Sequence, residues 1–267
     1  MLDPITTLST STQTILITGG NGYIAKSLRK ALDNNYNITY ITRQDFDLTD
    51  RVSTDEWFRG KHFDVVIHTA VKGGNRLQQD NGDVFYQNLQ MFYNLYYNRH
   101  RFNKFIHFGS GAELGQPSTP YGLSKKIIND IIQSELGFYN IRIFGVFDEN
   151  ELDTRFIKSN IKRYINKESI TIYQNKHMDF FYMKDLVFLV DHYIKENHLP
   201  KVAECSYNEK YTLLDIANII NQLSNYKVPI EQFDSIIGDS YIGMTIPNLE
   251  FLGLKQGIKE VYNKLYI

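Results

Sequence analysis

The sequence predicts an α/β fold built on a doubly wound parallel sheet, and three observations support that prediction. Short apolar segments rich in β-branched residues alternate with amphipathic helical segments through the first half of the chain. A glycine-rich turn separates the first strand from the first helix. The length of 267 residues is enough for one large or two small domains. Strands that alternate with helices form parallel sheets with right-handed crossovers.

The first strand and helix form the most informative stretch of the chain. Residues 15–17 are an apolar run typical of a strand buried on both faces. The turn that follows has the spacing Thr-Gly-x-x-Gly-x-x-Ala at 18–25. The N–H groups of such a turn and the positive end of the helix attract a pyrophosphate, although glycine turns also occur as plain connections. We predict that a dinucleotide contacts four residues here: Gly19, Gly22, Tyr23 and Ile24.

The remaining elements are expected in a regular order. Apolar β-branched runs predict strands at 38–41, 64–68, 104–108 and 140–144. Helical spacing of apolar residues predicts helices at 52–58, 83–99 and 121–136. After about Val146 the rhythm changes, and we expect a short strand at 169–173 and helices at 154–165, 182–194, 213–223 and 256–265. Thr212 stands where one of these helices needs an N-cap.

This change of rhythm divides the chain into three expected parts. Residues 1–13 are rich in Ser and Thr, lack a basic start and an apolar segment, and are expected to form a disordered tail. Residues 14–150 are expected to form the dinucleotide-binding domain, to which the second half can return a strand or a helix. Residues 151–267 are expected to form a smaller substrate-binding lobe, with a cleft at the carboxyl ends of the strands.

Composition and charge exclude several classes of function. The formal net charge is -1, which gives no electrostatic basis for binding nucleic acid or an anionic membrane surface. No apolar run is long enough to span a bilayer, and the histidines show no metal-binding spacing. The single cysteine, Cys205, cannot form an internal disulfide, which favours a reducing compartment and a cytoplasmic location.

Tyr121 and Lys125 form the pair most indicative of catalysis. A phenol and an ammonium four residues apart share one face of a helix, and the ammonium favours the phenolate and lowers the phenol pKa. Ser110 follows a predicted strand, where a loop can bring its hydroxyl beside Tyr121. Tyr-x-x-x-Lys also arises by chance as a surface tyrosine and a solvated lysine. Its place after the strand, glycine turn and helix favours the catalytic interpretation.

The order of these motifs resembles the extended short-chain dehydrogenase/reductase family, in its branch of NAD(P)-dependent nucleotide-sugar epimerases, dehydratases and reductases. The resemblance covers about 14–265 and rests on Thr18-Gly-Gly-Asn-Gly22, Asp47-Leu48, His68-Thr-Ala70, Asn88, Gly109-Ser110, Tyr121 with Lys125, Arg142-Ile-Phe-Gly-Val-Phe147, Asp179-Phe-Phe-Tyr-Met-Lys-Asp185 and Leu252-Gly253. Segment 64–88 is similar to GDP-fucose synthases, and segments 110–121 and 142–185 are similar to CDP-paratose synthases. Both kinds of enzyme reduce C4 of a keto-deoxy sugar nucleotide.

The resemblance implies a Rossmann-type sheet and a role for each motif residue. Tyr121 is expected to be the acid/base, Lys125 to bind the nicotinamide ribose and tune Tyr121, and Ser110 to hydrogen-bond the sugar oxygen. The implied cofactor site also includes Asp47 and Leu48, which would meet the adenine, and Ala70 and Asn88.

The resemblance leaves the substrate diphosphate without its usual partner. In this branch an arginine commonly precedes the Asp-Phe motif, and here Met178 stands in its place. Arg155, Lys158 or His177 would have to supply the charge, unless the substrate lacks a diphosphate. The basic residues of 154–165 are equally consistent with a solvated helix face. The expected substrate-binding set is completed by Lys72 and Glu113.

Arg43 favours NADP as the cofactor, with NAD as the second choice. It follows the second strand, where an NAD enzyme usually carries Asp or Glu to hold the ribose 2′-hydroxyl. A guanidinium suits a 2′-phosphate instead. Asp45 is near enough in the sequence to leave the alternative open.

The combined pattern predicts an NADP-dependent reductase that transfers hydride to C4 of a nucleotide-activated 4-keto-6-deoxy sugar, with Tyr121 as the proton donor. One alternative is a nucleotide-sugar 4-epimerase with tightly bound NAD. An alternative of another class is a non-catalytic NAD(P)-binding regulatory protein. Dehydration is disfavoured, because dehydratases of the family usually carry an Asp-Glu pair after the catalytic Ser/Thr and Ser110 is followed by Gly-Ala-Glu.

Epimerisation at C3 or C5 is not expected. The resemblance places Ala112 and Arg155 where GDP-fucose synthases carry a cysteine and a histidine that move protons at carbon. Alanine has no titratable proton, and a guanidinium essentially never releases one. Glu113 is the one nearby group that can substitute.

We also expect a homodimer, as in relatives. Helices 83–99 and 121–136 of two copies would form a four-helix bundle. Four residues are expected to offer apolar surface beyond the need of one core: Leu95, Tyr96, Ile128 and Ile132.

Overall fold

A computed structural model describes residues 12–74 and 79–266, so that the expected disordered tail at 1–13 lies almost wholly outside the described residues. Six strands form a parallel sheet in the order β2-β1-β3-β4-β5-β9, which confirms the predicted α/β class. These strands are β1 (Thr14–Thr18), β2 (Asn37–Ile41), β3 (Phe63–His68), β4 (Phe102–Ser110), β5 (Phe138–Ile143) and β9 (Val202–Cys205).

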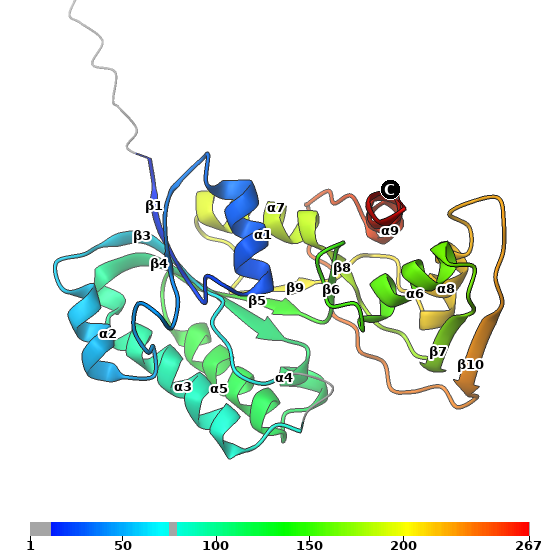
Figure 1. Ribbon diagram of the computed structural model, residues 1–267. Coiled ribbons are helices and arrows are strands. Elements are labelled where there is room, and N and C mark those ends of the chain that lie inside the picture. Colours follow the sequence, from blue (N-terminus) through cyan, green and yellow to red (C-terminus); the bar gives the residue numbers. More distant parts are fainter. Residues whose placement is uncertain (1–11, 75–78, 267) are drawn as a thin grey trace, which may run out of the picture.

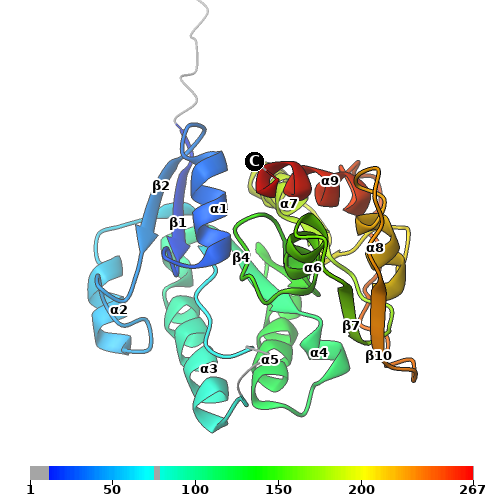
Figure 2. The same cartoon turned by 45° about the vertical axis from the view of Figure 1, so that its right-hand side comes forward.

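Helices cover both faces of the sheet (Figure 1). On one face α1 (Tyr23–Leu32) packs beside α7 (Met183–Lys195). The other face carries α2 (Arg51–Phe58), α3 (Gly82–Tyr97) and α5 (Pro120–Ser134), and Figure 2 shows the two helix layers on opposite sides. Each face has its own apolar core: β1 places Ile15 and Ile17 in one core and Leu16 in the other. This burial on both faces explains the unbroken apolar run at the start of the chain.

The C-terminal lobe has a separate apolar core between short strands and helices. Two parallel strand pairs, β6 (Val146–Phe147) with β8 (Phe181–Tyr182) and β7 (Ile170–Gln174) with β10 (Ile230–Asp234), pack with α6 (Phe156–Ile165), α8 (Leu213–Ile220) and α9 (Leu254–Leu265). Thr212 caps α8 as expected. Its hydroxyl accepts a hydrogen bond from Asp215 N, and the Asp215 carboxylate accepts one from Thr212 N.

Part of the second half returns to the sheet domain. Helix α7 packs on α1, and β9 pairs with β5 in parallel. Lys104 on β4 fixes this return, because its Nζ donates to the carbonyl oxygens of Tyr193, Ile194 and Glu196 at 2.7–2.9 Å. These carbonyls lie at the C-terminal end of α7, where a cation is favourable.

The apolar surface expected on α3 and α5 is used inside the chain. Leu95, Ile128 and Ile132 are buried between these helices and the sheet, and the Tyr96 hydroxyl donates to Glu135 at 2.5 Å. The prediction that Leu95, Ile128 and Ile132 form surplus surface is wrong, because helical periodicity does not separate a core face from an interface face, whereas Tyr96 is partly exposed. The large apolar residues that these two helices do expose are Tyr86, Tyr97 and Leu123.

Between residues 12 and 266, leaving out 75–78, no helix is both long enough and apolar enough to cross a membrane.

Candidate active site

The expected catalytic residues meet at the carboxyl edge of the sheet. Ser110 is the last residue of β4, and Tyr121 and Lys125 lie in the first turns of α5. Thr119 is the N-cap of this helix, with its Oγ1 accepting from Gly122 N at 3.1 Å, and Pro120 takes the first helical position. The helix therefore begins at a defined residue and presents Tyr121 and Lys125 one turn apart on the same face.

The Lys125 ammonium is buried beneath the site. The residue is 4% exposed, its Nζ donates to the Phe108 carbonyl oxygen at 2.7 Å, and the same atom lies 3.4 Å from His107 Nε2. Burial lowers the pKa of Lys125 to about 8, and the Glu113 carboxylate acts in the opposite direction. The side chain is therefore a cation at neutral pH and loses its proton under mildly alkaline conditions.

The Tyr121 phenol is protonated at neutral pH. Burial raises its pKa, and a hydrogen bond with Ser110 partly offsets this effect. The Lys125 ammonium lies 5.8 Å from the centre of the Tyr121 ring and donates to a backbone carbonyl instead. Burial therefore outweighs the lowering effect predicted for the lysine, and the pKa of Tyr121 is raised in the protein alone. A protonated phenol beside Ser110 is suited to donate a proton.

The loop after β3 lies directly against the Tyr121 ring. A Cβ atom on Gly74 would be 2.8 Å from Tyr121 Cζ, which leaves no room for a side chain. Gly73 and Gly74 both have positive φ angles, of 76° and 70°. These two glycines allow the backbone to approach the phenol closely.

Asn88 holds this loop in place. Its Oδ1 accepts from Lys72 N at 2.8 Å, and its Nδ2 donates to Lys72 O at 3.0 Å and to Ser124 Oγ at 3.2 Å. The Asn88 amide is thus hydrogen-bonded to the loop after β3 and to α5, whereas the resemblance implied a contact with the cofactor. Ala70, also expected at the cofactor, donates its N–H to Thr18 Oγ1 at 3.2 Å and lies beside Gly19.

Glu113 lies next to Ser110. It belongs to the short helix α4 (Ala112–Gly115) and is buried. Its carboxylate accepts from Ser110 N at 2.8 Å, from Arg142 Nε at 2.9 Å and from Asn140 Nδ2 at 3.2 Å. These bonds use the carboxylate internally. The substrate contact expected for Glu113 is corrected to a role in positioning the Ser110 backbone.

Arg142 joins this site to the strand that returns from the second half. It pairs with Glu113 and with Glu204 on β9, and all three side chains are buried. Glu204 in turn accepts from Met244 N at 2.6 Å. The network therefore runs from the serine loop to the C-terminal lobe.

Tyr241 reaches the site from that lobe and was not among the predicted residues. Its hydroxyl lies 3.5 Å from Ser110 Oγ, and its ring packs edge-on against Phe144 with 5.3 Å between ring centres. A Cβ on Gly111 would be 2.7 Å from Tyr241 Cζ. Sequence reasoning missed this tyrosine because its segment has no periodicity and lies 131 residues from Ser110.

The glycine turn fits a dinucleotide. Gly19 has a φ of 67°, and a Cβ there would lie 2.8 Å from the Ala70 backbone. Gly22 is the N-cap of α1 and provides no side-chain cap, and the first turn of α1 has no acidic residue. An uncapped helix start without negative charge suits a pyrophosphate. Tyr23 donates its hydroxyl to Asp148 at 2.6 Å and Ile24 packs against the core, so both offer the ligand their backbone.

The loop after β2 presents Arg43 to solvent. Asp45 is turned toward the loop, where its Oδ2 accepts from Thr42 N at 2.7 Å and from Thr42 Oγ1 at 3.0 Å. Asp47 accepts similarly from Thr49, and the Leu48 side chain is buried in the core. Leu48 can therefore meet an adenine only through its backbone.

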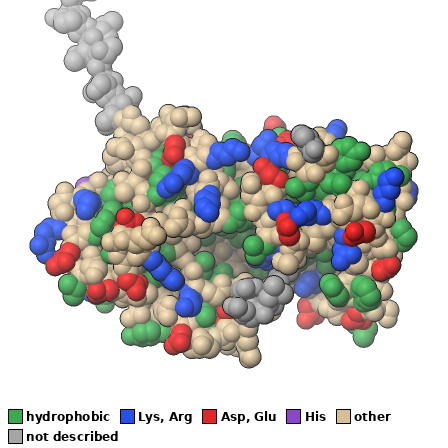
Figure 3. All heavy atoms as spheres, in the orientation of Figure 1, with side chains coloured by type: hydrophobic (Ala, Val, Ile, Leu, Met, Phe, Trp, Pro, Cys, Tyr) green, Lys and Arg blue, Asp and Glu red, His purple; other side chains and the backbone are tan. Residues whose placement is uncertain are grey.

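A cavity of about 300 Å³ lies in the C-terminal lobe, and Figure 3 shows that the molecular surface is hollowed between this lobe and the sheet domain. Arg155, the N-cap of α6, lines the cavity together with Lys176 and Met178. His177 lies between these two lining residues in the chain, does not line the cavity, and forms an antiparallel backbone bridge with Thr212. An extended chain alternates its side chains, so Lys176 faces the cavity and the predicted His177 does not.

Lys158 is also absent from the lining of the cavity. It is buried, its Nζ donates to Glu151 O at 2.7 Å, and it pairs with Asp153 at 2.8 Å. Of the three cations expected to face a substrate diphosphate, only Arg155 lines the cavity. Lys176 is the cation that the sequence-based selection missed.

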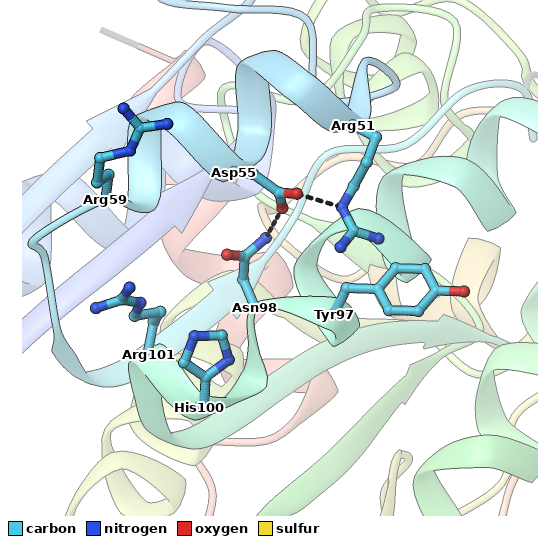
Figure 4. A pocket seen from close by; sticks show the side chains of 7 residues that line it. All are labelled: Arg51, Asp55, Arg59, Tyr97, Asn98, His100 and Arg101. Atoms are coloured by element: carbon cyan, nitrogen blue, oxygen red, sulfur yellow. Dashed lines mark hydrogen bonds and ion pairs between the residues drawn. The ribbon is translucent and has the colours of Figure 1, made fainter.

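A second cavity, of about 260 Å³, lies where α2 and α3 lead into strands β3 and β4. Its lining side chains are Arg51, Asp55, Arg59, Tyr97, Asn98, His100 and Arg101 (Figure 4). Asp55 accepts from Arg51 and from Asn98 at 2.6 Å, and the Arg51 guanidinium stacks 4.0 Å from the centre of the Tyr97 ring. Arg59 is the C-cap residue of α2, where a cation is favourable, whereas Arg51 begins that helix and is held by Asp55 and the Tyr97 ring.

Solved structures of sugar-nucleotide enzymes share this fold. A GDP-6-OMe-4-keto-L-xylo-heptose reductase from C. jejuni superposes with a TM-score of 0.75 at 15% identity over 95% of this chain and 97% of that chain. A dTDP-4-dehydrorhamnose reductase from Bacillus anthracis, in complex with NADP, gives 0.75 at 15% identity over 95% and 98%. A UDP-N-acetylglucosamine 4-epimerase from Bacillus cereus gives 0.74 at 18% identity over 95% and 96%.

A search of curated protein sequences finds no significant match. A family profile, described as "NAD dependent epimerase/dehydratase family", matches residues 15–208, which is most of the chain. The match spans the glycine turn, the Ser110, Tyr121 and Lys125 cluster and the returning strand β9. The chain therefore belongs to the NAD dependent epimerase/dehydratase family.

Proposed function

We propose that this protein is an NADP-dependent reductase that transfers hydride to C4 of a nucleotide-activated 4-keto-6-deoxy sugar. The observation that carries the proposal is the joint placement of Ser110, Tyr121 and Lys125 at the carboxyl edge of the sheet, near the glycine turn. Ligands of doubly wound sheets bind at this edge. The family relationship supports the cofactor class, and the neighbouring folds named above include reductases of keto sugar nucleotides.

The proposed reaction needs a proton donor at the ketone oxygen. The bound nicotinamide supplies the hydride. The raised pKa of Tyr121 keeps its phenol protonated, so that it can donate to the oxyanion that forms at C4. Ser110, with its hydroxyl held by Ala112 N and near Tyr241, donates a second hydrogen bond to the same oxygen. The Lys125 cation stabilises the developing negative charge from below.

The nucleotide diphosphate is proposed to bind at the cavity of the C-terminal lobe. Arg155 stands at the start of α6, where the helix dipole adds positive potential, and Lys176 supplies a second cation. Lys72 follows β3 on the side of the catalytic residues, and its backbone is fixed by Asn88. We propose that Lys72 contacts the sugar part of the substrate.

The 4-epimerase alternative shares the same catalytic residues. It is favoured by the similarity of fold to UDP-N-acetylglucosamine 4-epimerase. The orientation of Arg43 and Asp45 opposes it, because the exposed guanidinium suits NADP, whereas an epimerase that recycles its hydride would hold NAD tightly. A non-catalytic regulatory role is opposed by the complete Ser110, Tyr121 and Lys125 set.

We propose a homodimer formed through the outer faces of α3 and α5. Tyr86 is 61% exposed, Tyr97 51% and Leu123 36%, and all three lie on these two helices. They take the place of the buried residues that the sequence had suggested for this interface.

The Tyr121→Phe variant tests the proton donor. Turnover is expected to fall about 10²–10⁴-fold, because the variant lacks the phenolic proton but keeps the ring that packs on Gly74. Cofactor binding and thermal stability are expected to stay near those of the natural protein. Tyr266→Phe, which changes an exposed tyrosine at the end of α9, is the matched control. Near-full turnover by Tyr121→Phe would exclude this residue as the acid.

The Arg43→Ala variant tests the choice of cofactor. The Kd for NADPH is expected to rise roughly 10- to 100-fold through loss of a charged hydrogen bond, with little change for NADH. Titration calorimetry with both cofactors measures the difference, and Arg59→Ala provides a control arginine outside the loop after β2. Tighter binding of NADH than NADPH, unaltered in Arg43→Ala, would contradict NADP preference.

Solvent deuterium tests whether the enzyme epimerises at C3 or C5. The protein and NADP⁺ are incubated in D₂O with a 4-keto-6-deoxy sugar nucleotide. No deuterium is expected at either carbon, because Ala112 has no acidic proton and the Glu113 carboxylate is bonded to Arg142 and Ser110 N. Incorporation above the rate without enzyme would overturn the proposal and identify an epimerising reductase.

A further inference from the structure

A row of polar side chains crosses the sheet beneath α5. Thr18, His68, His107 and Asn140 are register partners on the adjacent strands β1, β3, β4 and β5. Register partners on parallel strands place their side chains on the same face. All four residues are buried, and the rings of His68 and His107 stack with 5.5 Å between their centres. A polar row inside an apolar layer requires an explanation, because unpaired buried polar groups are costly.

His107 is the member of this row that meets a catalytic group. Its Nε2 lies 3.4 Å from the Lys125 ammonium, and its Nδ1 has no partner among the described residues. Burial and the nearby Lys125 cation lower the pKa of His107 well below its usual value, so the ring is neutral. An ammonium can only donate, and therefore Nε2 is the acceptor and Nδ1 carries the hydrogen.

Asn140 is the register partner of His107 on β5. Asn140 Oδ1 is an acceptor without a partner among the described residues. The amide nitrogen of the same side chain donates to Glu113, which accepts from Ser110 N. The hydrogen bonds that start at Ser110 N thus reach Glu113 and Asn140, and the only hydrogen bond of the His107 ring among the described residues is the one with Lys125.

We propose that His107 is a positioning residue of the active site, which accepts a hydrogen bond from the Lys125 ammonium through Nε2 and thereby stabilises its charged form. The proposal deepens the proposed reductase function and rests on it for the role of Lys125. The lysine has three N–H donors, of which one is directed to Phe108 O and one to His107. The third is left for a ligand on the cofactor side.

The other charged and titratable groups around His107 and Lys125 come from four elements. They are His68 on β3, Glu113 on α4, Tyr121 on α5 and Arg142 on β5. His68 is neutral, since burial lowers its pKa to about 3. Arg142 is paired with Glu113 and Glu204. The acceptor nitrogen of His107 is thus the group on β4 whose removal changes the hydrogen bonds of Lys125 without changing the charge of the site.

The His107→Phe variant tests this role. It keeps an aromatic ring but removes the acceptor, so the charged form of Lys125 loses stabilisation and its pKa should fall by about one pH unit from about 8. The pKa is read by NMR of protein labelled with ¹³C-lysine, from the pH dependence of the signal that is missing in Lys125→Arg. His107→Gln, which can carry an acceptor to the same place, should restore the value to within a few tenths of a unit.

Phe105→Leu is the matched control for a disturbed core, since Phe105 is buried on the same strand and face two residues away. It should leave the Lys125 pKa unchanged. If His107→Phe does not fold, His107→Asn takes its place, because the shorter amide does not reach Nζ. An unchanged Lys125 pKa in the variant without the acceptor, or an equal fall of that pKa in His107→Phe and Phe105→Leu, would overturn the proposal.

Enzyme turnover provides a second, separate readout. The alkaline fall in turnover with NADPH should move to lower pH in His107→Phe in step with the NMR value. The NMR titration requires no substrate. Absence of turnover in the natural protein would therefore count against the reductase function alone, and the position of the NMR midpoint would still decide the role of His107.

Discussion

The buried ion pairs of Arg142 are the interaction on which the rest of this structure depends. Arg142 on β5 bonds Glu113, from the loop that carries the catalytic serine, and Glu204, on the strand that returns from the second half. Glu204 also accepts from the backbone of the segment that carries Tyr241. Removing one partner of a buried pair leaves an uncompensated charge, at a cost of about 3–5 kcal/mol. One guanidinium thus joins the serine loop, the sheet edge and the C-terminal lobe.

Burial also sets the protonation states in the site. The same lack of water raises the pKa of Tyr121 and lowers that of Lys125 to about 8. At neutral pH the site therefore contains a protonated phenol above a cation, an arrangement that favours proton donation to an oxyanion. The sequence motif alone suggested a phenolate stabilised by the lysine. The fold changes that expectation because the phenol is buried, which raises its pKa, and because one N–H of the ammonium is directed to Phe108 O.

Local patterns predicted the long elements well, because a helix such as α3 or a strand such as β4 has enough residues to show its period. The two-residue strands β6 and β8 are too short to show a period, and the five-residue strand β10 was not predicted. Ser110, Tyr121 and Lys125 could be selected because they follow the glycine turn in the order typical of the family, and their catalytic role stays a prediction. The sequence did not indicate that Lys176 and not His177 lines the cavity, or that Tyr241 lies near Ser110. Both facts depend on how the second half of the chain folds back.

The central claim is that the enzyme reduces its substrate with net consumption of cofactor. The direct measurement is to incubate the protein with NADPH and a panel of 4-keto-6-deoxy sugar nucleotides, and to quantify oxidised cofactor and product together. The account predicts equimolar NADP⁺ and a single C4-reduced product with at least one nucleotide sugar. Interconversion of 4-hydroxy sugar nucleotides with no net oxidation of NADPH, by protein that retains NAD through purification, would contradict it and identify a 4-epimerase.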